Sequence, residues 1–293
     1  MKKIIGLSFI LMASTLTFAQ ENDQVQNKNG VDIMPVQGEF AIGMNAVPVF
    51  NFVGDLFGYT GSNNALGGDK FVSYFSSNTL FGKYMLTDNT AIRAHFRIGM
   101  DNFSYQNEVF NDTDNDPENL VMDTYKHSNS TYNIGLGYEW RRGKTRLKGL
   151  YGGELLYQHQ SGASFDYEYG NTFGNGNPAP TSTEWSSFGE VINENPAAER
   201  QASFNGGNFN GIGIRAFAGL EYYIAPKICI GTEFGWGLMG GWNGQSSSVT
   251  ESWDPTANAT GAIVRDEIIG SKGTSWNLDT DNFGGSLYFM FYF

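Results

Sequence analysis

An alternation of large apolar or aromatic side chains with small or polar ones runs through Tyr132-Asn133-Ile134-Gly135-Leu136-Gly137-Tyr138-Glu139-Trp140. A period of two residues is typical of a β-strand, because successive side chains point to opposite faces. The polar sequence Arg142-Gly143-Lys144-Thr145 follows, and the alternation then resumes over residues 147–158. This stretch therefore predicts a β-hairpin with a tight polar turn.

The same plan recurs on both sides of this hairpin. Residues 80–98 and residues 212–238 each form two alternating runs that are joined by a short polar turn. One further strand is expected near 39–52, and the last is expected near 279–293, where large apolar residues again alternate. The sequence thus predicts eight strands.

The connections between these strands alternate between short and long. Three are the tight turns, and the other four are long and rich in Gly, Asn, Ser and Asp, at residues 53–70, 107–127, 162–206 and 243–277. All the long connections therefore emerge at one end. An even strand number with short turns at one end and long loops at the other is typical of outer-membrane barrels. The predicted fold is all-β, an eight-stranded up-and-down antiparallel transmembrane β-barrel.

The position of the charges favours a membrane barrel over a water-soluble lipocalin-type barrel, which would have the reverse polarity. One row of strand positions carries nearly all the strand charges, and the opposite row carries Tyr, Trp, Phe and Leu. We therefore expect the aromatic row to face lipid and the charged row to face the bore. The expected luminal charge cluster comprises Lys83, Arg93, Arg97, Glu139, Lys148, Glu154, Arg215, Glu221 and Glu233.

The bore of an eight-stranded barrel is just wide enough for side chains to fill. A general porin channel is therefore not expected. The five bases and four acids of the cluster are expected to neutralise one another, which removes the cost of burying lone ions. A proton or ion path along these charges is the alternative. His95 shares this face and is expected to be a hydrogen-bonded core histidine.

The ends of the chain predict its location. Residues 1–19 combine Lys2 and Lys3 with an apolar run and a small-residue site before Gln20, as a signal peptide does. Removing the two lysines leaves 16 bases against 30 acids, a net charge of 16 − 30 = −14, which disfavours nucleic acid as a partner. We expect a flexible segment at 20–37 and a barrel over 38–293 in the cell outer membrane. The single cysteine, Cys229, excludes a disulfide framework.

The signal peptide, the strand alternation and the terminal Tyr288-Phe289-Met290-Phe291-Tyr292-Phe293 resemble the small eight-stranded outer-membrane barrel proteins of Gram-negative bacteria, the OmpX-like and OmpA-barrel type. The resemblance implies that Phe289, Phe291 and Phe293 form an assembly signal that the barrel-assembly machinery recognises. The sequence departs from the two-domain OmpA pattern, because it ends at the last strand. A cell-wall tethering role is therefore not expected.

His159 and Ser161 are the candidate catalytic residues. A histidine beside a serine is how an acyl-transfer nucleophile is activated, and the pair resembles the His-x-Ser motif of outer-membrane lipid A deacylases. Gly162-Ala163 follow instead of the Asn-containing continuation of that family, and no acid is placed to orient the imidazole. Two polar residues at the end of a strand are the ordinary explanation.

The acidic residues Asp112, Asp114, Asp116 and Glu118 are the candidate metal ligands, because oxygen ligands at every second position are typical of calcium loops. Pro117 replaces the glycine of an EF-hand at the sixth position, and Asp123 replaces the final glutamate. A loose divalent site and a solvated acidic loop remain as the two interpretations. No cofactor is expected.

The long connections carry many aromatic side chains among polar ones, and loops on a rigid scaffold are where binding usually occurs. The sequence therefore predicts a non-enzymatic structural or surface-interaction role, with outer-membrane lipid and an extracellular ligand as partners. A lipid-modifying acyl hydrolase is one alternative. Passage or binding of small apolar molecules, in the manner of OmpW-like barrels, is another. The aromatic residues are Phe165, Tyr167, Tyr169, Phe173, Trp185, Phe188, Trp253 and Trp276.

Overall fold

The computed structural model describes residues 25–45, 80–114, 116, 118–186, 188–279 and 286–293. All the secondary-structure elements in these residues are β-strands. Among these residues no helix is long and apolar enough to cross a membrane. The predicted signal peptide and the long connection at 53–70 lie outside the described residues.

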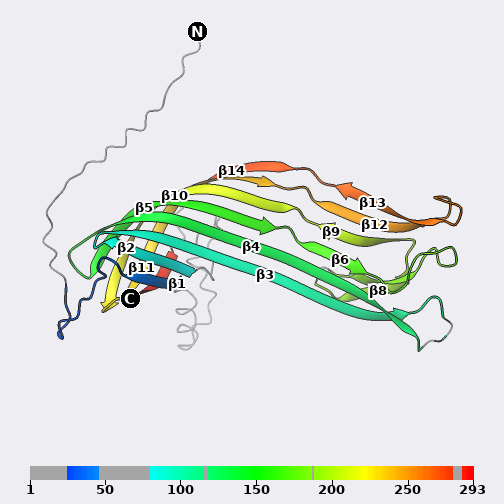
Figure 1. Cartoon of the computed structure of the whole chain (residues 1–293), viewed down its shortest axis with the longest axis horizontal. Coiled ribbons are helices and arrows are strands. Elements are labelled where there is room, and N and C mark those ends of the chain that lie inside the picture. The colour runs from blue at the N-terminus through cyan, green and yellow to red at the C-terminus, as the bar shows by residue number, and fades with distance from the viewer. Residues whose placement is uncertain (1–24, 46–79, 115, 117, 187, 280–285) are drawn as a thin grey trace, which may run out of the picture.

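Eight strands close into an antiparallel barrel, at the left of Figure 1. The ring runs β1-β2-β3-β4-β5-β10-β11-β15, and β15 returns to β1 through pairs such as Ile42↔Phe291. This closure confirms the predicted up-and-down barrel. The strands are β1 (Phe40–Asn45), β2 (Leu80–Thr87), β3 (Thr90–Phe110), β4 (Leu120–Arg142), β5 (Leu147–Ser161), β10 (Asn208–Ala225), β11 (Ile228–Asn243) and β15 (Ser286–Tyr292).

The last strand is described in two parts. β14 (Gly273–Asp279) pairs with the outer half of β11, and β15 pairs with its inner half. Residues 280–285, between the two, lie outside the described residues. The pairing thus begins earlier than the predicted 279. Only Trp276 and Leu278 are large and apolar in this stretch, so its alternation is short.

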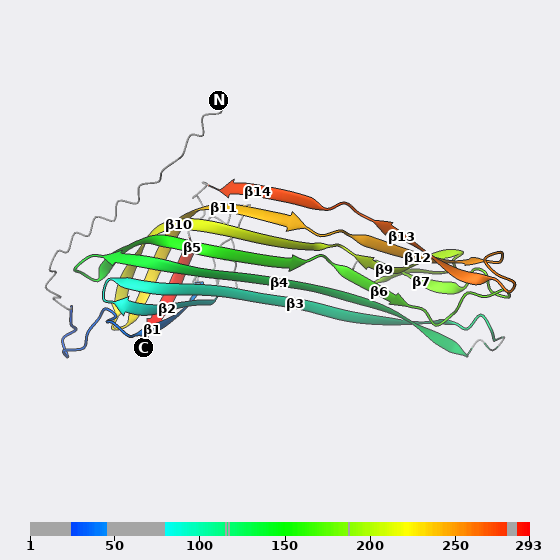
Figure 2. The ribbon, with the colours of Figure 1, turned by 45° about the horizontal axis from the view of Figure 1, so that its top comes forward.

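Three of the predicted long connections are mostly strands and not loops. β3 and β4 stay paired out to Phe110↔Leu120, and β6, β9, β12 and β13 extend the sheet beside them in the order β4-β6-β9-β12-β13. Figures 1 and 2 show this external sheet running away from the barrel. The additional strands are β6 (Ser164–Glu168), β7 (Thr181–Trp185), β8 (Val191–Pro196), β9 (Glu199–Asn205), β12 (Ser247–Asp254) and β13 (Ala262–Ile269).

Length explains why the external sheet leaves the membrane. A tilted strand needs about 9–11 residues to cross the hydrocarbon core, whereas β3 has 21 residues and β4 has 23. The outer half of each strand therefore projects beyond the bilayer. β7 and β8 form a separate hairpin that contacts β3 and β4.

Glycines mark the line where the barrel strands continue into the external sheet. Gly207, between β9 and β10, has a φ of +78°, and its N–H donates to Asn205 Oδ1 at 2.8 Å. A Cβ atom on Gly207 would lie 2.8 Å from the carbonyl oxygen of Gly244, so only glycine fits this crossing. We call this line the glycine seam; it comprises Gly162, Gly206, Gly207, Gly244 and Gly270.

The barrel has its apolar side chains outside and its charges inside. On β2, Leu80 and Tyr84 are 45% and 37% exposed, whereas Lys83 between them is 4% exposed. The same parity holds around the ring, so isoleucine, leucine, phenylalanine, tyrosine and tryptophan side chains cover the outer surface. A closed barrel with an apolar exterior and a polar interior is the architecture that spans outer membranes. The protein is therefore a transmembrane β-barrel of the outer membrane, as its alternation predicts.

The segment before β1 packs against the barrel end that carries the short turns. Ile33 and Met34 are buried in the apolar cluster at that end. Lys227 forms hydrogen bonds to the backbone carbonyl groups of both residues. The Lys227 N–H donates to the Ile33 carbonyl at 3.0 Å, and its Nζ donates to the Met34 carbonyl at 2.9 Å and pairs with Glu39 at 2.6 Å. Over residues 25–37 the structure thus differs from the flexible segment predicted for 20–37. Ile33 and Met34, the two residues that are buried in the cluster, are adjacent in the chain and carry no periodic signal.

Candidate functional site

An ionic network fills the bore in two connected tiers. In the tier nearer the short turns, Lys83 Nζ lies 2.7 Å from Glu139 Oε2 and 2.6 Å from Glu221 Oε1. Arg141 pairs with both carboxylates and donates from Nη1 to the Tyr292 hydroxyl at 2.7 Å. All these side chains are buried. Each ion therefore has several partners, as burial of charge requires.

The second tier lies farther from the short turns than the first. Arg93 Nη1 lies 2.7 Å from Glu233 Oε2, and its Nε lies 2.6 Å from Glu154 Oε1. Arg215 Nη1 lies 2.9 Å from Glu154 Oε2 and 2.6 Å from Glu233 Oε1. A contact of 3.3 Å between Arg93 and Glu139 joins the tiers. Four bases thus balance four acids across the two tiers.

The network differs from the predicted cluster at three positions. Arg97 is only half-buried, and Lys148 lies near a short turn, where its Nζ donates to the Gly143 carbonyl. Arg141 is a network member that the sequence reasoning missed. Its position two residues after Glu139 on β4 places it on the luminal face, so the alternation itself contained the signal.

His95 lies on the luminal face beside the second tier. Its Nδ1 is 3.8 Å from Glu154 Oε1. A Cβ atom on Gly135 would lie 2.0 Å from His95 Cε1, so the imidazole occupies the space that the glycine leaves open. The histidine is therefore packed into the wall of the bore.

The structure gives His159 and Ser161 separate hydrogen-bond partners. His159 Nδ1 lies 2.8 Å from Asn210 Oδ1 on β10, while Ser161 Oγ accepts the Ser130 N–H of β4 at 2.6 Å. A catalytic pair needs the base within hydrogen-bonding reach of the nucleophile. Here each side chain is tied to a different neighbouring strand.

The acidic turn does not gather its carboxylates around one point. Asp114 Oδ1 accepts the Asp116 N–H at 3.1 Å, and Asp116 Oδ1 accepts the Glu118 N–H at 3.0 Å. Asp112 turns toward Thr181, whose N–H it accepts at 2.7 Å. Among the described residues, no group of three or more His, Cys, Asp or Glu side chains is arranged to hold a metal ion. In the structure the carboxylates of Asp114 and Asp116 instead accept hydrogen bonds within the turn.

Burial alone would raise the pKa of Asp112. Hydrogen bonds from Thr181 and Asn177, together with the positive charge of Arg200, outweigh this effect and lower the pKa below its usual value. Asp112 therefore joins the acidic turn to the segment that leads into β7.

The luminal face of the barrel strands continues outward as an aromatic face of the external sheet. Tyr125 of β4 is 1% exposed, and its ring centroid lies 6.1 Å from that of Tyr105, 5.3 Å from that of Tyr167 and 5.8 Å from that of Trp185. Burial raises the pKa of Tyr125 to about 12. We call this surface the aromatic face; it comprises Phe103, Tyr105, Tyr125, His127, Phe165, Tyr167, Trp185 and Phe204.

Neighbouring strands supply cross-strand pairs to this face, such as Tyr105↔Tyr125 and Tyr125↔Tyr167. Aromatic cross-strand pairs stabilise a sheet. Of the aromatic residues predicted in loops, Phe188 and Trp276 lie apart from this face and are 83% and 75% exposed.

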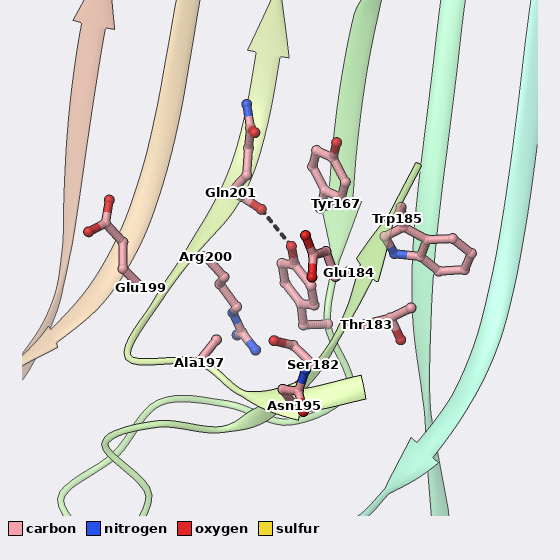
Figure 3. Close-up of a pocket in the computed structure, with 11 residues that line it drawn as sticks. Tyr167, Ser182, Thr183, Glu184, Trp185, Asn195, Ala197, Glu199, Arg200 and Gln201 are labelled. Carbon is pink, nitrogen blue, oxygen red and sulfur yellow. Dashed lines mark hydrogen bonds between the residues drawn. The ribbon is translucent and has the colours of Figure 1, made fainter. Parts of the chain in front are cut away.

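A pocket of about 400 Å³ lies where the β7–β8 hairpin meets the external sheet (Figure 3). Arg200 forms part of its wall: the guanidinium carbon lies 4.0 Å from the ring centroid of Tyr169 and 4.7 Å from that of Phe173, and Nε donates to Glu251 at 3.0 Å. The Tyr169 hydroxyl donates to the Gln201 carbonyl at 2.7 Å, the dashed line in Figure 3. These contacts fix the arginine in one orientation.

Asp123 holds Thr183, which lines the pocket, through a hydrogen bond. Its side chain is fully buried and accepts the backbone N–H groups of Gly170 at 2.9 Å and Thr183 at 2.7 Å. This carboxylate therefore connects β4 to β7 and to the segment after β6. The sequence predicted Tyr167, Tyr169 and Trp185 only as aromatic residues of the long loops, and it predicted neither Arg200 beside them nor the hydrogen bonds of Asp123.

Comparison with known proteins adds little to these observations. No family model and no curated protein matches the chain. Among solved structures, the chain is similar to the outer membrane protein OprG from Pseudomonas aeruginosa, with 10% sequence identity and a TM-score of 0.29 over 89% of this chain and 98% of that chain. Because this superposition is loose, the assignment of the fold rests on the strand pairing and sidedness of the chain itself.

Proposed function

We propose that the protein is a non-enzymatic surface-interaction protein, in which the barrel anchors a rigid external sheet that binds an extracellular ligand. The observation that carries this proposal is the aromatic face. Phe103 and Tyr105 remain 47% and 38% exposed on it although they are large and aromatic. Exposed aromatic side chains grouped on a rigid scaffold are typical of binding surfaces.

The filled bore supports binding in preference to passage of molecules. The two tiers of ion pairs connect strands on opposite sides of the barrel, for example Lys83 of β2 and Glu221 of β10. Small apolar molecules would have to displace these buried charges. We expect no channel conductance in planar lipid bilayers, and regular openings would support transport instead.

The separate partners of His159 and Ser161 support a non-enzymatic role. We expect no release of fatty acid from lipid A by the purified protein. Release that disappears in Ser161→Ala would establish the hydrolase alternative. For assembly, we propose that Phe289, Phe291 and Phe293 on and just after β15 are recognised by the barrel-assembly machinery before the strand pairs with β1.

The test of the surface role is the adhesion of Gram-negative cells that produce the full chain. Retention is measured on polystyrene coated with mucin or with fibronectin. We expect the wild type to raise retention on at least one coating, and the double variant Phe103→Asn/Tyr105→Asn to remove the increase. The matched control is Met122→Asn, because Met122 is 40% exposed on the opposite face of β4. Retention that equals the empty vector, or that survives the double variant, would contradict the proposal.

A further inference from the structure

The pocket beside the β7–β8 hairpin contains two hydrogen-bond donors that are not used within the described part of the chain. Arg200 is 8% exposed, and its Nη1 atom has no hydrogen-bond partner among the described residues. The buried indole Nε1 of Trp185, which lines the same pocket, also has none among them. Buried donors without acceptors are costly and rare in folded proteins. Two at one pocket indicate a ligand that supplies acceptor oxygens.

Flat aromatic surfaces lie beside these donors. The rings of Tyr167 and Tyr169 both line the pocket, with centroids 6.2 Å apart and planes only 6° from parallel. Figure 3 shows Tyr167 and Trp185 on one side of the pocket and Arg200 on the other. The volume, about 400 Å³, falls within the usual range for small-molecule sites. The pocket thus offers an aromatic surface to one side of a ligand and polar groups to another.

The charge around the pocket disfavours an anionic ligand. Of the described residues that line it, only Arg200 is basic, and Glu251 already neutralises that charge. Glu184 and Glu199 also line the pocket, and both are exposed. A neutral ligand that carries hydroxyl groups suits both the N–H donors and the carboxylates of the pocket. A hydroxyl accepts a hydrogen bond from Arg200 or Trp185 and donates one to a carboxylate.

We propose that this pocket binds a neutral saccharide, with a sugar ring against Tyr167 and Tyr169 and hydroxyl oxygens that accept from Arg200 and Trp185. The inference rests on the proposed surface role and names the ligand class. Both donor atoms belong to side chains that line the pocket.

The experiment is saturation-transfer-difference NMR on the full chain in phosphatidylcholine nanodiscs. The probes are glucose, galactose and maltose, with glucuronic acid as the anionic sugar of the same ring size. We expect at least one neutral sugar to bind at millimolar concentration and at least about fivefold more tightly than glucuronic acid. Absence of transfer to every neutral sugar, or a preference for glucuronic acid, would overturn the proposal.

Substitutions locate the site. Trp185→Phe keeps an aromatic ring but removes the N–H donor, and we expect it to weaken binding about three- to tenfold. Tyr167→Ala removes one stacking surface and should weaken binding at least about tenfold. Trp276→Phe is the matched control, because Trp276 lies on β14 outside the pocket. Heat-modifiable gel mobility checks that each variant is folded.

Wild-type affinity in both Trp185→Phe and Tyr167→Ala would show that the sugar binds elsewhere and would overturn the assignment. The two proposals can fail separately. If cells adhere through the aromatic face while no neutral sugar binds, the surface role remains and the saccharide assignment is wrong.

Discussion

Arg93 of β3 and Glu233 of β11 form an ion pair across the bore, with Nη1 and Oε2 2.7 Å apart. β3 and β11 are four strands apart in the ring of eight, so the two residues lie on opposite walls. The pair thus spans the bore and links both halves of the barrel.

Glu233→Gln should lower the stability of the barrel by about 3–5 kcal/mol, because it removes a buried carboxylate that pairs with both Arg93 and Arg215 and leaves the four bases of the two tiers facing three acids. The urea midpoint of unfolding, followed by gel mobility, measures the change. Arg142→Gln is the control, since Arg142 is exposed on the outer face of β4, and it should change stability by less than about 0.5 kcal/mol. Equal midpoints for the two variants would mean that the luminal pairs contribute nothing net.

Ile33→Ala should loosen the segment before β1. The side chain is fully buried, and removing it costs about 2–5 kcal/mol at such positions. The measurement is the rate at which proteinase K removes the N-terminal segment from the folded protein. Val31→Ala is the matched control, because Val31 is 47% exposed. If the two variants are cut equally fast, Ile33 does not anchor the segment.

Gly207→Ala should destabilise the junction between the barrel and the external sheet. The positive φ costs a non-glycine residue about 1–3 kcal/mol, and the added Cβ would crowd the Gly244 carbonyl. Gly240→Ala on β11 is the control, because a Cβ there meets no atom within 4 Å. Hydrogen exchange of the β9 amides should rise in Gly207→Ala and stay unchanged in Gly240→Ala; the reverse order would rule out a role for the seam.

Asp112 should make the acidic turn sensitive to low pH. Its pKa is lower in the folded protein than in the unfolded chain, because hydrogen bonds from Thr181 and Asn177 outweigh the effect of burial. Its stabilising contribution is therefore complete above the unfolded pKa of about 3.9 and is lost as the pH falls through the folded pKa. Hydrogen exchange of the Thr181 amide between pH 5 and pH 2 measures this loss. Asp112→Asn should remove the pH dependence, and an unchanged profile would exclude Asp112 as its source.

Much of the barrel could be predicted because alternation is a local property. Leu80 is at an even and Lys83 at an odd position of the same strand, so their side chains point to opposite faces. In a membrane barrel this difference places Leu80 on the outer surface and Lys83 in the bore. The external sheet could not be predicted in this way. β8, for example, is exposed at all six positions, so no apolar row distinguishes it from a loop.

The sequence by itself determined the number of barrel strands, their sidedness and the aromatic content of the external region, because each depends on spacing along one strand. Only the tertiary structure decided which charges meet across the bore, for example that Arg93 pairs with Glu233. It also decided that Tyr167, Trp185 and Arg200 meet at one pocket. These contacts join residues that are far apart in the chain, and they depend on strand register and barrel closure, which no local pattern contains.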